Sequence, residues 1–117
     1  MELVAFLGDD KENWGQVTAL VKHMHWEKIL LVKNARAEGF PDLPQCTSLE
    51  VNTDLPLVEL KQELMEKLKS NLHDFEVALS IASGNGKEHM ALIAALLSLP
   101  VGIRIVVFTK KGVEFIT

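Results

Sequence analysis

The chain alternates short runs of almost wholly apolar residues with longer segments in which apolar residues recur every three or four positions. The runs Glu2–Leu7, Lys28–Lys33 and Ile103–Thr109 place apolar side chains on both faces of any strand they form. Strands of this kind are typical of parallel sheets that helices cover on both faces. The alternation therefore predicts an α/β fold with a mostly parallel sheet of about five strands and helices on both faces.

The segments between and after these runs supply the other predicted elements. Helical spacing of apolar residues predicts three helices: Trp14–Met24, Leu57–Leu72 and Glu88–Leu99. Shorter apolar stretches predict three further strands: Ser48–Asn52, Phe75–Ala82 and Val113–Ile116. The last of these follows the turn Lys110–Gly112 and is expected to pair antiparallel with the strand before it, and residues 40–44 are expected to form a loop.

Composition limits the classes of protein to which the chain can belong. Apolar residues make up 48% of the 117 residues, enough for the core of one domain over residues 1–117. The single cysteine, Cys46, indicates a reducing compartment, so a cytoplasmic location is expected. We expect neither a signal peptide nor a membrane span. The net charge of −4 argues against duplex DNA as a partner but leaves room for a small anionic ligand.

Two loops are expected at the ligand-binding edge of the sheet. Ligands of open parallel sheets bind beyond the carboxyl ends of the strands, where the strand order switches. The residues that follow the first and fourth strands should lie there. They are Gly8, Asp9, Asp10, Lys11 and Asn13 in the first loop, and Ser83, Gly84, Asn85, Gly86 and Lys87 in the second.

The second loop, Ser83–Lys87, has the chemical groups of a phosphate site. Its glycines permit close backbone approach, and it opens a helix whose first amides and dipole favour an anion. Lys87 adds a positive charge. The spacing matches neither the Walker motif nor G-x-G-x-x-G, so a purely structural glycine turn is the alternative. No metal or other cofactor is expected.

Four residues near this edge are considered for specific roles. Asp9 and Asp10 would repel a polyphosphate, so capping of the following helix is the favoured role of Asp10, and a Mg²⁺-assisted site is the alternative. His89 lies in the first turn of the last long helix and is a weak candidate, with Lys87, for a catalytic role. Trp14 is expected to anchor a loop or the core.

The segment 88–99 is apolar almost all round and needs cover on two sides. The sheet covers one side, and we expect a second copy of the chain to cover the other, which gives a two-fold homodimer. The alternative is that the helix Leu57–Leu72 or a loop covers it.

At this point the sequence resembles a family. Residues Ala78–Phe108, ALSIASGNGKEHMALIAALLSLPVGIRIVVF, are similar to the second signature of CRISPR-associated Rossmann-fold (CARF) domains, and FLGDDKENWG lies where that family has its other ligand loop. The family usually shows Gly-Gly-Thr/Ser-Lys, whereas this chain has Gly84-Asn85-Gly86-Lys87 and so lacks the hydroxyl. The resemblance implies a Rossmann-like fold.

The resemblance also implies a function. A homodimer would bind a cyclic oligoadenylate, or another small anionic nucleotide, between its paired turns, in CRISPR-linked antiviral signalling or regulation. Lys87 would neutralise phosphate, and residues 8–13 would flank adenine or ribose. The family joins this sensor to a nuclease or DNA-binding domain, so a separate effector protein is a possible partner. Two alternatives remain open: a metal-independent ring nuclease that cleaves the bound ring, and a non-catalytic interaction subunit.

Overall fold

The computed structural model describes residues 1–41 and 43–117, so the predicted loop 40–44 includes one residue, 42, outside the described part. Six strands form one sheet in the order β3-β2-β1-β4-β5-β6. Their bounds are β1 Glu2–Leu7, β2 Lys28–Lys33, β3 Cys46–Glu50, β4 Glu76–Ser80, β5 Gly102–Thr109 and β6 Gly112–Phe115. Neighbouring strands are parallel except β5 and β6, which form the antiparallel pair expected at the end of the chain.

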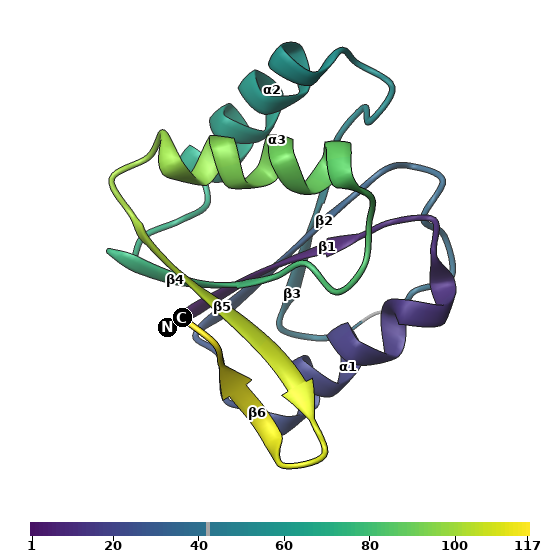
Figure 1. Cartoon of the computed structure of the whole chain (residues 1–117), viewed down its shortest axis with the longest axis vertical. Coiled ribbons are helices and arrows are strands. Elements are labelled where there is room, and N and C mark those ends of the chain that lie inside the picture. The colour runs from purple at the N-terminus through teal and green to yellow at the C-terminus, as the bar shows by residue number, and fades with distance from the viewer. Residues whose placement is uncertain (42) are drawn as a thin grey trace.

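The helices lie on both faces of the sheet, as Figure 1 shows. α1, Trp14–His23, follows a short 3-10 helix, η1, at Lys11–Asn13, and packs on one face. α2, Leu57–Lys69, and α3, Gly86–Leu97, pack on the opposite face. The predicted α/β architecture and its Rossmann-like character are therefore confirmed.

Each face of the sheet has its own apolar core because side chains of a strand alternate between the faces. Phe6 and Leu30 face α2 and α3 and pack with the leucines at four-residue spacing on α2. Leu3 and Ile29 face α1 and pack with Trp14 and Trp26. The two cores leave β1 wholly buried, which is why its sequence shows no alternation of polar and apolar residues.

Several element boundaries differ from the sequence prediction by one to three residues, and two of these differences have identifiable reasons. β3 begins at Cys46, two residues early, because Cys46–Glu50 pairs in parallel register with Ile29–Lys33 of β2. α3 begins at Gly86 because Asn85 caps it: the Asn85 side chain accepts from the Glu88 amide, and the Glu88 side chain accepts from the Asn85 amide. This reciprocal capping box fixes where the helix starts.

The apolar helix α3 is covered on two sides within one chain, since the sheet lies under it and α2 packs beside it. The alternative that α2 covers its second side is therefore confirmed for most of its length. Met90 and Leu97 stay 58% and 70% exposed. No helix among the described residues is both long and apolar enough to cross a membrane.

Candidate functional site

The loops after β1 and β4 meet at the carboxyl edge of the sheet, because these two strands are neighbours although they are distant in sequence. Both loops lie to the right of the sheet in Figure 1. The Gly8 amide donates to Ser83 Oγ at 2.9 Å, and the Ser83 hydroxyl donates to Asp10 Oδ1 at 2.6 Å. This edge is also where the strand order switches, so the structure brings together the two loops chosen from the sequence.

The two loops approach so closely that glycine is required at their contact. A Cβ at Gly8 would lie 2.6 Å from the Gly84 Cα, closer than any real contact of that kind. Gly84 itself has a φ of +110°, a conformation that other residues rarely adopt. The two loops are therefore in direct contact at Gly8 and Gly84.

Asp10 joins the loops rather than capping a helix, so the capping prediction is wrong. Its side chain makes no cap hydrogen bond to η1. It accepts instead from the Gly84 amide at 2.9 Å and from Asn13 Nδ2 at 2.8 Å, in addition to Ser83. Partial burial favours a higher pKa for Asp10, but these hydrogen bonds outweigh burial and hold the pKa below its usual value. The charged carboxylate is thus a structural bridge.

The start of α3 has fewer free amides than the sequence suggests. The Gly84 amide donates to Asp10, and the Asn85 amide donates to Glu88 Oε1 at 2.9 Å. These two amides are therefore not free for a ligand. The amides of Gly86 and Lys87, by contrast, donate to no other residue in the described chain. They are the donors left at the positive end of the helix.

Lys87 reaches sideways along the sheet edge. Its ammonium donates to the Thr53 carbonyl at 2.9 Å, in the loop after β3. The Thr53 hydroxyl in turn accepts from the Asn34 side chain, just after β2. A second bridge runs parallel to this one, since Arg36 lies 3.9 Å from the exposed carboxylate of Asp9. The four carboxyl-end loops are therefore linked into one polar rim.

A small acidic hollow of about 190 Å³ lies beside the turn, lined by Asp9, Asp10, Glu88, Gly84 and Asn85. Burial, followed by the nearby Asp9 charge, raises the pKa of Glu88 above its usual value, and the hydrogen bond from Asn85 opposes this only in part. No group of three His, Cys, Asp or Glu side chains in the described chain is arranged to hold a metal ion. This hollow repels phosphate.

The remaining predicted site residues serve the turn itself or the core. His89 Nε2 lies 2.7 Å from the Ser83 carbonyl oxygen. The Lys11 ammonium lies over the Trp14 ring at 5.4 Å, and Trp14, which is buried as expected, donates its indole N–H to the Gly8 carbonyl at 3.0 Å. These contacts hold the two loops in place.

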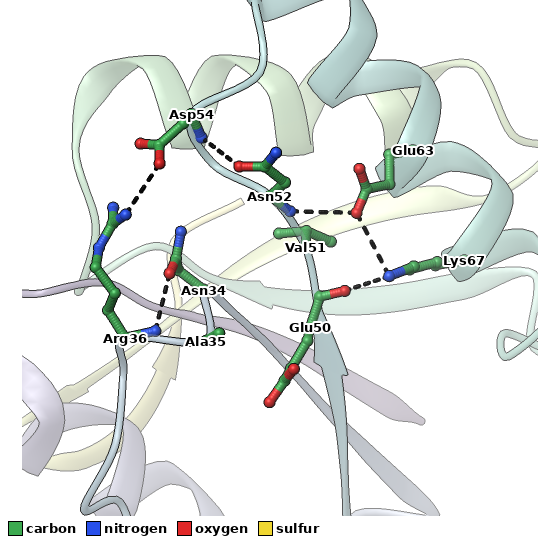
Figure 2. A pocket seen from close by; sticks show the side chains of 9 residues that line it. All are labelled: Asn34, Ala35, Arg36, Glu50, Val51, Asn52, Asp54, Glu63 and Lys67. Carbon is green, nitrogen blue, oxygen red and sulfur yellow. Dashed lines mark hydrogen bonds and ion pairs between the residues drawn. The ribbon is translucent and has the colours of Figure 1, made fainter.

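A larger hollow, of about 490 Å³, lies next to the rim at the ends of β2 and β3 and is drawn in Figure 2. Its lining includes Asn34, Arg36, Asn52 and Asp54, none of which was chosen from the sequence. The available signal was position: polar residues directly after a buried parallel strand fall on the ligand-binding edge.

Compared with known proteins, the chain matches no family model and no curated protein.

Proposed function

We propose that this chain is a dimeric ligand-sensing domain that binds a small anionic nucleotide, a cyclic oligoadenylate in the first instance, at the start of α3. The observation that carries the proposal is that the amides of Gly86 and Lys87 have no hydrogen-bond partner among the described residues, while the Lys87 ammonium lies on the same carboxyl edge of the sheet, bonded to the Thr53 carbonyl. Amides, helix dipole and ammonium act together on a phosphate.

The neighbouring charges restrict where the phosphate lies. Asp9, Asp10 and Glu88 surround the hollow on one side of the turn, and their field repels an anion. Lys87 is exposed and is held by one neutral carbonyl, so its flexible side chain can exchange Thr53 for a charged phosphate oxygen. We therefore propose that the phosphate lies on the Lys87 side of the α3 start, toward β3.

The dimer in this proposal forms through the exposed part of α3. Met90 lines an apolar groove of about 340 Å³ with Leu57, Val58 and Ala94, and Leu97 continues the apolar surface along the helix. A two-fold axis along α3 would pair these surfaces and bring both Lys87 side chains to the same end of the dimer. A ring with two-fold symmetry fits such a paired site. An effector protein would then read the bound state.

Incubation with cyclic tetra-adenylate and cyclic hexa-adenylate tests the proposal, with calorimetry for binding and chromatography for products. We expect binding and recovery of the intact ring. Linear products would show that the chain is a ring nuclease and not a sensor. Lys87 would then stabilise the charge that develops on the attacked phosphate. Absence of binding to either ring would contradict nucleotide sensing and favour an interaction subunit.

A further inference from the structure

The hollow at the ends of β2 and β3 has walls from three elements. Figure 2 shows Asn34, Ala35 and Arg36 from the end of β2 on one side, the segment 50–54 in the middle, and Glu63 and Lys67 of α2 on the other side. The Asn34 side chain is buried and accepts from the Arg36 amide at 2.8 Å. The Asn52 side chain accepts from the Asp54 amide at 3.1 Å. These local bonds give the hollow a preorganised polar wall.

The charges around the hollow do not suit a phosphate. Arg36 is paired with Asp54 at 3.0 Å, and Lys67 is paired with Glu63 at 3.4 Å. Both cations of the lining are therefore neutralised, and Glu50 adds one more carboxylate. An anion would find no unpaired positive charge there, whereas an uncharged polar group meets no electrostatic penalty.

The groups that remain available match those that bind a nucleobase and its ribose. The Asn52 side-chain NH2 donates to no residue of the described chain, and an asparagine amide is suited to the paired donor and acceptor edge of adenine. Asp54 fixes the Arg36 guanidinium, whose flat face can stack on a planar base. Carboxylates in the lining can accept hydrogen bonds from an amino group or from ribose hydroxyls.

The hollow adjoins the phosphate position proposed above. Lys87 bonds to the Thr53 carbonyl, and Thr53 lies between two lining residues, Asn52 and Asp54. Arg36 lines the hollow and also lies beside Asp9 of the first loop. A nucleotide whose phosphate is held by Lys87 can therefore place its base or ribose in the hollow.

We propose that this hollow, lined by Asn34, Arg36, Asn52 and Asp54, is a subsite for the uncharged nucleoside part of an adenine nucleotide. The inference builds on the proposed function, because it takes the ligand class from there. It moves the base away from residues 8–13 and toward the ends of β2 and β3.

Amide chemical shifts from two-dimensional NMR of the full chain test the subsite with separate probes. Adenosine, which lacks phosphate, is expected to shift the amides of residues 34–36 and 50–54 and to leave 84–88 unchanged. Cyclic tetra-adenylate is expected to shift both groups. If the cyclic ring shifts residues 84–88 but not 34–36 and 50–54, the subsite is wrong and the proposed function stands. If adenosine shifts the hollow and neither ring binds, the subsite stands without the proposed function. Adenosine that leaves the hollow unshifted overturns the subsite.

Substitutions sharpen the test. Asn52→Ala is expected to weaken adenosine binding roughly three- to tenfold, the effect of one or two uncharged hydrogen bonds. Gln62→Ala removes an exposed amide from α2 outside the hollow and should leave affinity unchanged. Arg36→Lys keeps the charge and removes the flat stacking surface, so it should also weaken adenosine binding. It serves as the test variant if the NMR spectrum shows that Asn52→Ala is misfolded. If Arg36→Lys and a folded Asn52→Ala both bind adenosine as tightly as the native chain does, the subsite is contradicted.

Discussion

Asp9 and Asp10 are adjacent acidic residues, but their surroundings make their contributions to stability different. The Asp9 side chain is 66% exposed, and it lies 3.9 Å from the exposed guanidinium of Arg36. The Asp10 carboxylate accepts hydrogen bonds from a hydroxyl, an amide N–H and a side-chain amide that belong to both loops. The sequence predicts a polar loop at this place, but it does not show which carboxylate faces Ser83.

Asp10→Ala should lower the free energy of unfolding by about 2–3 kcal/mol, because the buried Ser83 hydroxyl and the Gly84 amide both lose their hydrogen-bond acceptor. The matched variant Asp9→Ala should change it by less than about 0.5 kcal/mol. Urea unfolding of the three proteins at neutral pH measures the difference. Equal effects of both variants would show that the bridge between the loops does not stabilise the fold.

The glycines of the two loops also differ in how much they contribute to stability. Gly8→Ala places a Cβ 2.6 Å from the Gly84 backbone and should destabilise the chain by about 3 kcal/mol. Gly86→Ala meets nothing within 4 Å at the start of α3 and should be neutral or slightly stabilising. Thermal unfolding ranks the variants, and a tolerated Gly8→Ala would contradict the close approach of the loops.

Glu88 predicts a pH dependence of a definite sign. Its pKa is raised in the folded state, so its contribution to stability is complete below the pKa of the unfolded chain and is lost as pH rises through the folded value. Glu88→Gln cannot ionise. The free energy of unfolding of Glu88→Gln minus that of the native protein should therefore be more positive at pH 7 than at pH 4. Urea titrations at both pH values measure this difference, and a difference that stays constant or reverses would contradict burial as its cause.

At the scale of elements, the strongly periodic segments were predictable and the cover of α3 was only partly so. The leucines four apart on α2 identify a buried face, and the structure buries Leu60, Leu64 and Leu68 completely. The apolar residues of α3 show that two sides need cover, but they cannot show that α2 provides most of it. That outcome depends on how helices that are distant in sequence pack side by side on one face of the sheet.

The exposed part of α3 predicts how self-association can be broken. Leu97→Glu with Met90→Glu should convert a dimer to a monomer, because a charge cannot be buried at an apolar contact without a partner, while stability should change little at these exposed positions. Ile116→Glu is the matched control, since Ile116 is 60% exposed near the C-terminal strand. Sedimentation velocity measures the mass, and a native chain that is monomeric at micromolar concentration would contradict the dimer.

For the whole molecule, the order of elements along the chain was enough to predict a mostly parallel sheet with helices on both faces. Parallel strands joined by helices place the first and fourth loops at one edge, and the hydrogen bonds from Gly8 to Ser83 and from Ser83 to Asp10 confirm that placement. The direction of Lys87 and the hollow beside Asn52 were not predictable. They depend on Thr53 and Asn34 from other strands, which only the folded sheet brings to the rim.

The affinity of Lys87→Ala for cyclic tetra-adenylate shows whether a phosphate binds at the start of α3. Loss of a charged hydrogen bond should weaken binding by roughly 1–3 kcal/mol. Lys111→Ala, in the turn between β5 and β6, removes the same net charge at a distance and should bind like the native chain. Calorimetry of the three proteins at one salt concentration should therefore single out Lys87. Equal affinities of all three proteins, or a native chain that does not bind, would contradict a phosphate site at the start of α3.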